Sequence, residues 1–239
     1  MSRCKLSLPM KLVNRLTSWS RLVILKIKKR RAKEVENKQN PNLIIEMANK
    51  SIIKIELMPD LAPNTVASVV SLAEQGLYDN RPFYRVVKDF VIQAGCSKEM
   101  DYETGCDYSL DSECADAGFQ TPQPEFTKYM VGMAGLGPGS NTTSGSVFFI
   151  MTGDVPRLNG NYPVIGKVIS GFEEVDRINN VPCSETMYKE IKFYQPLEKE
   201  IMEKVTVETY GVKYPSPKIK VRPENHLETD NELNKIRRY

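Results

Sequence analysis

The sequence predicts a mainly β fold, either a barrel or a sandwich, with helices covering its ends. Three observations lead to this class. About eight short runs rich in β-branched and aromatic residues are spread along the chain, only two internal segments have helical periodicity, and no internal repeat occurs. The strand pattern by itself does not distinguish a barrel from a sandwich.

The first elements expected are a hairpin and a helix. Residues 43–47 and 52–57 are β-rich runs separated by the turn-forming segment Asn49-Lys50-Ser51. Pro63 suits the first turn of a helix, because its fixed φ is helical and its missing N–H is not needed there. Gly76 is the expected C-cap of this helix, whose apolar face carries Val66, Val69, Val70 and Ala73.

Six further strands and a second helix are expected later in the chain. The strands are predicted at residues 83–87, 90–93, 131–134, 147–151, 164–169 and 204–210, and an acidic helix at residues 172–178. Residues 96–128, which are rich in Asp, Glu, Gly and Pro, are predicted to form a long loop. A loop of this length is usually functional or specific to one family.

The composition is that of a soluble globular protein, with 41% hydrophobic and 26% charged residues. The 239 residues suffice for one domain with tails. Cys96, Cys106 and Cys114 lie in one loop region, so a metal site or a redox pair has to be weighed. However, the 5 cysteines include no C-x-x-C, and the single histidine, His226, lies in the tail. We expect reduced thiols, a cytoplasmic location, no metal and no other cofactor.

Residues 1–41 are expected to form a basic N-terminal extension. Residues 1–40 hold 12 Lys/Arg and 2 Asp/Glu, whereas the rest of the chain holds 21 and 28. An amphipathic helix that contacts nucleic acid or an anionic membrane is one interpretation, because apolar residues recur at helical spacing at Leu12, Leu16, Trp19 and Val23. A disordered tail or a mistaken start codon is the interpretation that the composition favours. The apolar run at residues 22–25 is too short for a membrane span or a signal peptide.

Residues 83–95 combine a strand-like apolar run with one arginine and one glutamine, Arg85 and Gln93. Because strand side chains alternate between two faces, two strand segments here could direct both residues to one patch. A fixed cation and an amide beside apolar rings suit a small apolar ligand flanked by peptide groups. That description fits a proline within a polypeptide.

Four blocks of the sequence carry a resemblance to one family. They are Pro63-Asn64-Thr65-Val66 with Gly76-Leu77-Tyr78-Asp79, Phe83-Tyr84-Arg85-Val86 with Phe90-Val91-Ile92-Gln93-Ala94-Gly95, the run from Gly145 to Ile150, and the run from Leu158 to Val168. The second block resembles the F-H-R-V and F-M-I-Q-G-G segments of the cyclophilins, the peptidyl-prolyl cis-trans isomerases. The last two resemble their G-S-Q-F-F-I and L-D-G-x-x-x-x-F-G-K-V segments. The resemblance is greatest to bacterial cytoplasmic members, and it covers residues 42–212, which leaves 213–239 as a polar C-terminal tail.

The resemblance implies a closed eight-stranded antiparallel barrel capped by two α-helices. It also implies a monomeric enzyme that isomerises X–Pro bonds of unfolded or flexible polypeptides and so assists protein folding. Its partners would be proline-containing segments, and it would need no cofactor. The alternative is a binding module or chaperone that holds proline-containing peptides with little or no catalysis.

The matched positions imply roles for individual residues. Arg85 would be the catalytic residue, donating a hydrogen bond to the prolyl nitrogen when the amide is twisted. Gln93 would hold a substrate carbonyl. The remaining substrate-binding positions implied by the resemblance are Tyr84, Phe90, Val91, Ala134, Gly135, Val147, Phe149, Leu158 and Tyr162.

Several positions depart from the family pattern while Arg85 is retained. Tyr84 replaces the usual histidine, Val147 the usual glutamine and Gly135 the usual asparagine, so some polar groups of the groove are missing. These losses motivate the binding-module alternative. Arg157 stands where many eukaryotic members have tryptophan, which argues against tight binding of cyclosporin.

Overall fold

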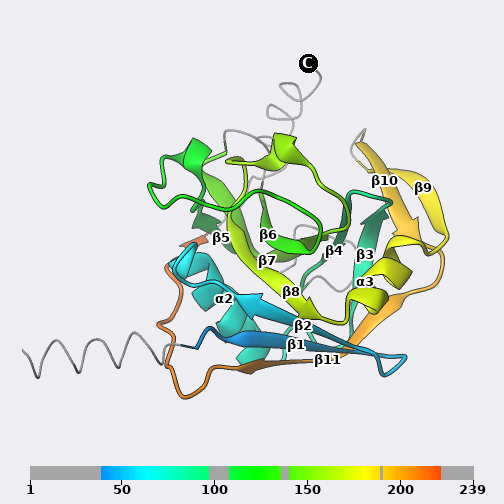
Figure 1. Cartoon of the computed structure of the whole chain (residues 1–239), viewed down its shortest axis with the longest axis horizontal. Helices are drawn as coiled ribbons and strands as arrows, with labels where there is room; N and C mark the ends of the chain where they lie inside the picture. Colours follow the sequence, from blue (N-terminus) through cyan, green and yellow to red (C-terminus); the bar gives the residue numbers. More distant parts are fainter. Residues whose placement is uncertain (1–38, 97–107, 136–139, 189–190, 222–239) are drawn as a thin grey trace, which may run out of the picture. The chain divides into compact units, whose positions relative to one another are not determined.

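The computed structural model describes residues 39–96, 108–135, 140–188 and 191–221 (Figure 1). The expectations for the basic N-terminal extension, for Cys106 and for residues 222–239 lie outside these ranges. None of the helices described is long and apolar enough to cross a membrane.

Eight strands close into a barrel. They hydrogen-bond in the order β7-β4-β3-β11-β1-β2-β8-β6, and β6 pairs again with β7, so the ring is complete. Every pairing around it is antiparallel. The predicted eight-stranded antiparallel barrel is therefore confirmed. The strands are β1 (Asn42–Met47), β2 (Ile52–Leu57), β3 (Arg81–Val87), β4 (Val91–Ala94), β6 (Met130–Gly135), β7 (Thr142–Met151), β8 (Val164–Ser170) and β11 (Glu200–Glu208).

The two expected helices are present as α2 (Pro63–Glu74) and α3 (Phe172–Asn179) (Figure 1). The end of α2 confirms the predicted cap. Gly76 has a φ of 67°, and the backbone N–H groups of Gly76 and Leu77 return to the carbonyls of Ala73 and Leu72, both at 3.0 Å. Glycine adopts this left-handed conformation without steric cost. The apolar face of α2 joins the barrel core, which includes Val66, Val69, Val70, Ile45, Ile53, Ile55, Phe83, Ile92, Phe148 and Ile150.

The predicted loop at residues 96–128 is only partly a loop. It contains β5 (Tyr108–Asp111) and the short 3-10 helix η1 (Ala115–Ala117). β5 pairs with the first residues of β7, which begins at Thr142 and thus earlier than expected. Polar residues such as Ser109 and Thr143 concealed this pairing, because a strand held by neighbouring backbone needs little apolar periodicity.

Three further strands were not expected from the sequence. β9 (Cys183–Tyr188) and β10 (Ile191–Pro196) form a separate antiparallel hairpin beside β3. β12 (Lys220–Val221) pairs with β5. Lys218, two residues before β12, is bound to the side chain of Asn64. The Lys218 N–H donates to the Asn64 amide oxygen at 2.7 Å, and the Asn64 amide nitrogen donates to the Lys218 carbonyl at 3.0 Å. The beginning of the polar C-terminal tail is thus packed against the domain.

A distant carboxylate caps the N-terminus of α2. Glu113, only 7% exposed, accepts hydrogen bonds from the backbone N–H groups of Asn64 at 3.0 Å and Thr65 at 2.8 Å. It also accepts one from the Thr65 hydroxyl at 2.7 Å. Ala62, the residue at the N-cap position of α2, has no side chain that could cap the helix. Glu113 therefore satisfies helix N–H groups that would otherwise be unpaired and ties the segment after β5 to α2.

Replacing Glu113 by alanine should destabilise the fold. Three hydrogen bonds to a buried charge are lost, and we expect the free energy of unfolding to fall by about 1–3 kcal/mol. Urea unfolding at neutral pH measures the change. Glu125→Ala removes an exposed carboxylate nearby and serves as the matched control. Equal unfolding midpoints for the two variants would contradict the capping role.

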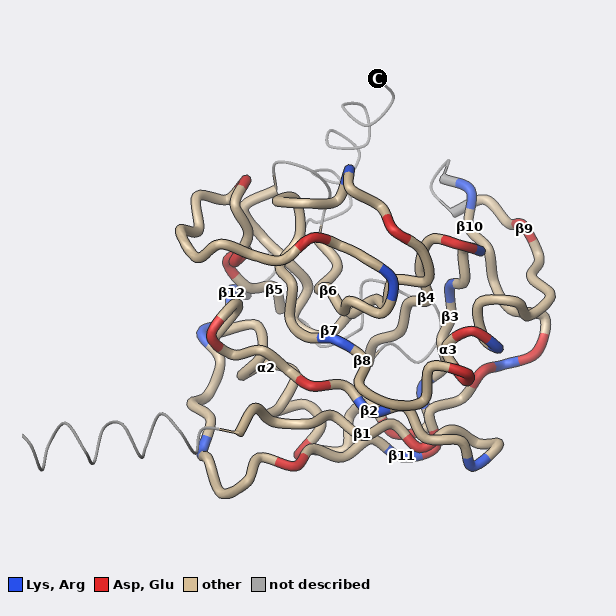
Figure 2. Tube along the Cα trace, in the orientation of Figure 1, with Lys and Arg blue, Asp and Glu red and all other residues tan. Residues whose placement is uncertain are grey.

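Ion pairs join the strands of the barrel and anchor α3. Figure 2 shows basic and acidic residues interspersed along β1, β2 and β11, where Lys54 pairs with Glu208 at 3.1 Å. Exposed pairs of this kind contribute little. Two better-shielded carboxylates are Glu174 of α3 and Glu200 of β11. The exposed Arg177 of α3 binds both of them, Glu174 at 2.7 Å.

The Glu174 carboxylate connects three parts of the chain. Besides Arg177, it accepts a hydrogen bond from the Asn49 amide at 2.9 Å, in the turn between β1 and β2. Burial by itself raises the pKa of Glu174, but the hydrogen bonds from Arg177 and Asn49 outweigh burial and leave the pKa below its usual value. The ionised form is therefore stabilised in the folded state.

The lowered pKa of Glu174 makes part of the stability depend on pH. Its contribution is fully present above the unfolded-state pKa of about 4.3 and disappears as the pH falls through the lower folded-state value. We expect Glu174→Gln to unfold more readily than wild type at pH 7, and the difference to shrink at about pH 3. Urea unfolding at both pH values measures this. Glu173→Gln, an exposed change in the same helical turn, should leave the stability nearly unchanged at either pH.

Candidate active site

Three neighbouring strands present a row of side chains on one face of the barrel wall. Phe149 of β7 lies opposite Gln93 of β4, and Gln93 lies opposite Arg85 of β3. Directly opposed residues of antiparallel strands point to the same face. Ile92, the neighbour of Gln93, points into the barrel core, so the row lies on the outer face.

A β-bulge in β3 brings Arg85 to this face. Phe83 pairs with Ala94 and Arg85 pairs with Gln93, so Tyr84 is an extra residue in β3. Without the bulge, Arg85 would share the face of Phe83, which is fully buried in the barrel core. Bulges often redirect a side chain beside an active site. The register shift therefore turns a core-facing position into a groove-facing one.

Gln93 is held at both ends of its amide. Arg85 donates from Nη1 to Gln93 Oε1 at 2.9 Å, and Gln93 Nε2 donates to the Tyr84 hydroxyl oxygen at 3.3 Å. Gln93 is 7% exposed and Tyr84 is 3% exposed, whereas Arg85 is half-buried. Within the described ranges Arg85 forms no ion pair with a carboxylate. Its charge is therefore oriented by Gln93 without being neutralised.

The apolar side of the site is a cluster separate from the main core. The Phe149 ring meets the Tyr162 ring edge to face, with centroids 5.8 Å apart. Phe90 lies beside Arg85, with the Arg85 Cζ 6.0 Å from its ring centroid. The structure thus brings together most of the predicted pocket, since the same cluster contains Phe90, Val91, Ala134, Phe149, Leu158 and Tyr162.

The remaining predicted positions border the groove. Val147 packs with Tyr84 and Ala134 in a small third cluster. A Cβ at Gly135 would stand 3.8 Å from the Tyr162 ring, so this backbone lies next to the aromatic wall. The predicted apolar positions therefore belong to two clusters that share Ala134, and the individual roles of the site residues remain predictions.

Two aromatic residues that support the site were missed from the sequence. Phe126 packs on Phe149 with ring centroids 5.5 Å apart, and Phe193 of β10 stacks on Tyr84 at 6.3 Å with an interplanar angle of 8°. Neither lies in a matched motif. The polar segment before β6 contains two phenylalanines, Phe119 and Phe126, and nothing in its pattern singled out Phe126. Gly132 makes room for this packing, because a Cβ there would approach Phe149 Cζ to 2.4 Å.

The cysteines lie away from this row. Cys114 and Cys183 are free thiols, and burial raises the pKa of Cys183 above its usual value. Cys183 lines a separate cavity of about 320 Å³ with Val87, Lys88 and Asn180, and none of the predicted site residues reaches it. In the part of the chain that the structure describes, no group of three or more His, Cys, Asp or Glu residues is placed to hold a metal ion.

Comparison with known proteins identifies the family. A family model for cyclophilin type peptidyl-prolyl cis-trans isomerases matches residues 42–212. The chain belongs to the cyclophilin family. Members of this family catalyse the cis-trans isomerisation of X–Pro bonds.

Curated relatives and solved structures agree with this assignment. The probable peptidyl-prolyl cis-trans isomerase of Brucella suis is 37% identical over 142 residues, covering 57% of this chain and 71% of the relative. Peptidyl-prolyl cis-trans isomerase B of Bacillus subtilis is 36% identical over 137 residues, covering 57% and 88%. A cyclophilin type isomerase of Cryptosporidium parvum has 26% identity and a TM-score of 0.57, covering 70% of this chain and 96% of its own.

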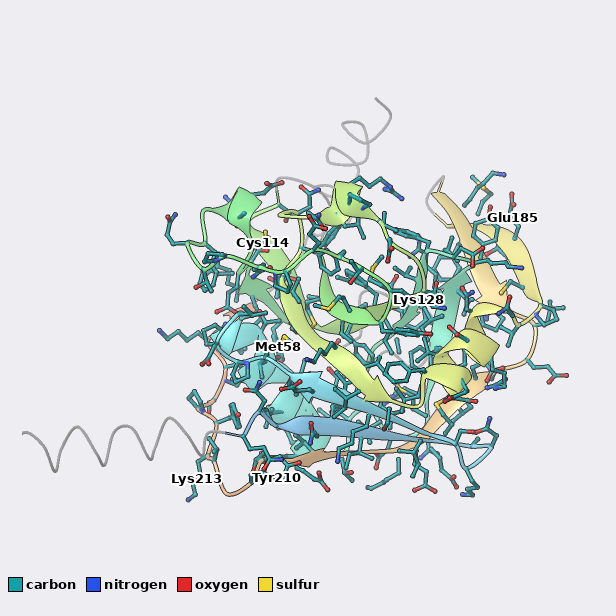
Figure 3. The ribbon with its side chains drawn as sticks, viewed as in Figure 1. Met58, Cys114, Lys128, Glu185, Tyr210 and Lys213 are labelled. Atoms are coloured by element: carbon teal, nitrogen blue, oxygen red, sulfur yellow. The ribbon has the colours of Figure 1, made fainter. Side chains whose placement is uncertain are left out.

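The Tyr84 hydroxyl accepts a hydrogen bond from the Gln93 amide and so restricts its orientation. We expect Tyr84→Phe to lower kcat/KM about 2- to 10-fold, mainly through kcat, because one neutral hydrogen bond is lost while the stacking on Phe193 remains. An NMR exchange assay on an X–Pro peptide measures the effect. Tyr210→Phe makes the same chemical change at the exposed residue labelled in Figure 3, and it should retain wild-type activity. A Tyr84→Phe variant with unchanged kcat would show that the phenol does not position Gln93.

Proposed function

We propose that this chain is an active peptidyl-prolyl isomerase in which Arg85 stabilises the twisted amide of the substrate. The alignment of Arg85, Gln93 and Phe149 across three adjacent strands carries this proposal. It places a cation, an amide and an aromatic pocket wall side by side, as an X–Pro segment requires.

Catalysis requires only that the protein stabilise the twisted X–Pro amide more than the planar one. Amide resonance gives the X–Pro bond a barrier of about 18–20 kcal/mol, and rotation removes that resonance. The prolyl nitrogen then regains a lone pair and accepts a hydrogen bond that the planar amide accepts poorly. A guanidinium placed there acts mainly on the transition state, which is the condition for raising kcat. The guanidinium acts as a hydrogen-bond donor, so the step needs no proton transfer.

The other residues hold the substrate while the bond turns. Val91, Phe149 and Leu158 are buried apolar side chains of one cluster, and they would enclose the prolyl ring. Gln93, fixed by Arg85 and Tyr84, would hold a substrate carbonyl. Fixing one side of the amide while the other rotates reduces the entropic cost of reaching the twisted state.

The proposed partners are exposed X–Pro segments of unfolded or flexible chains, whose turnover would assist folding in the cytoplasm. In support, a related Cryptosporidium parvum cyclophilin was crystallised in the presence of the dipeptide Ala-Pro. It is 25% identical, with a TM-score of 0.56, and the match covers 70% of this chain and 98% of its own.

We further propose that the protein acts as a monomer. Contact of residues 1–40 with nucleic acid or an anionic membrane remains a separate hypothesis, which truncation and salt dependence of binding would test.

The alternative function is a proline-peptide binding module with slow turnover. Val147 favours it, because this position is 5% exposed and packs against apolar rings, so it supplies no polar contact to a substrate backbone. NMR exchange spectroscopy separates the two functions. Rapid exchange of a bound X–Pro peptide supports the enzyme, and saturable binding without accelerated exchange supports the module.

Arg85→Ala should remove most of the activity without unfolding the barrel. A hydrogen bond from a charged donor to the transition state is worth about 1.5–3 kcal/mol, so we expect kcat/KM to fall about 10- to 100-fold. The NMR exchange assay measures the rate, and circular dichroism checks the fold. Arg81→Ala changes an arginine of the same strand outside the row, whose Nε binds the Leu77 carbonyl, and it should remain active. Undiminished turnover by Arg85→Ala would disprove the mechanism.

A further inference from the structure

A second arginine stands on the rim of the proposed proline pocket. Arg157 lies in the short 3-10 helix η2 (Pro156–Leu158), directly before the pocket residue Leu158. It is exposed, and its Cζ lies 4.9 Å from the centroid of the Phe90 ring. The Arg85 Cζ lies 6.0 Å from the same centroid. Two guanidinium groups thus flank one aromatic ring of the pocket, each within the range of a cation–π contact.

The backbone that carries Arg157 is tightly held. The Val155 N–H bonds to the Phe126 carbonyl at 3.0 Å, and the Leu158 N–H bonds to the Val155 carbonyl at 3.0 Å. The Asn161 amide donates to the carbonyl of Arg157 itself at 2.7 Å. The Cα of Arg157 therefore has a fixed place on the rim, and the Phe90 ring restricts where its side chain extends.

Arg157 has no carboxylate partner in an ion pair among the residues that the structure describes. Asp154, three positions earlier, accepts a hydrogen bond from the Lys128 N–H at 2.8 Å instead. By contrast, Arg177 in the same domain is paired with two carboxylates. The rim therefore carries two positive charges without ion-pair partners, although residues after position 40 hold 28 Asp/Glu against 21 Lys/Arg.

We propose that Arg157 makes this groove select X–Pro segments that carry Asp or Glu next to the proline. The inference rests on the proposed isomerase function and adds its substrate class. A carboxylate on a residue adjacent to the proline would approach the rim, where a guanidinium can form paired, charge-assisted hydrogen bonds. A lysine at the same position of the substrate would be repelled by the guanidinium groups of Arg85 and Arg157. For such a solvent-exposed pair, we expect a preference of about three- to tenfold for Glu over Lys.

The test uses two sets of proline peptides with Glu, Gln or Lys at one position. In one set the variable residue precedes the proline, and in the other it follows. NMR exchange measures kcat/KM for wild type, Arg157→Gln, Arg157→Lys and Lys213→Gln. Lys213 is an exposed cation after β11, labelled in Figure 3, and its replacement changes the net charge equally at a remote place.

Wild type and Lys213→Gln should both prefer Glu over Lys about three- to tenfold in at least one peptide set. Arg157→Gln should reduce this ratio to near one, and Arg157→Lys should retain most of it. The ratio should also decrease between about 0.05 and 1 M NaCl, because salt screens exposed charges.

The outcomes separate this inference from the function on which it rests. Turnover of the Gln peptides with equal rates for Glu and Lys in wild type would overturn the role of Arg157 and leave the isomerase intact. A Glu preference that persists in Arg157→Gln would overturn it as well. If no peptide is turned over, the isomerase proposal fails. The role of Arg157 is then tested by NMR titration, which gives the ratio of the affinities for the Glu and Lys peptides in the same four proteins.

Discussion

The register between β3 and β4 is the constraint on which the groove depends. Tyr84 is an extra residue in β3, and this bulge places Phe83 in the core and Arg85 on the outer face. If β3 kept Tyr84 in regular alternation, Arg85 would instead point into the closed barrel, where an unpaired charge is very costly. The same irregularity brings the Tyr84 hydroxyl within 3.3 Å of Gln93. Fold and site are thus determined by one local departure from strand alternation.

The positive charge of Arg85 is not paired with a carboxylate of the described residues, so it remains available to a substrate. Gln93 is a neutral partner that aims Arg85 through one of its donors, whereas a carboxylate in that position would satisfy the guanidinium before a substrate arrived. The apolar rings of Phe90 and Phe149 belong to one cluster beside it. An oriented cation in a locally dry setting interacts more strongly with a developing lone pair than one in bulk water.

The sequence was informative where local chemistry determines structure. Pro63 and Gly76 delimited α2, because capping acts over a few residues. Arg85 and Gln93 were correctly expected to share a patch, but the bulge at Tyr84 that brings them together was not foreseen. The sequence did not reveal β5, whose pairing with β7 depends on backbone brought from far along the chain. Phe193 was missed for the same reason, since its contact with Tyr84 requires the β9–β10 hairpin to fold back on β3. Barrel closure itself was supplied by the family resemblance.

The pairing of β12 with β5 has a consequence for where this domain ends. The family match stops at residue 212, yet β5 has β7 on one side and Lys220–Val221 on the other. A protein cut at the limit of the match would leave one edge of β5 uncovered. Open strand edges are templates for intermolecular pairing, so such a fragment would self-associate more readily than the full chain. The physical domain therefore extends beyond the homologous one, to the strand β12 that covers this edge of β5.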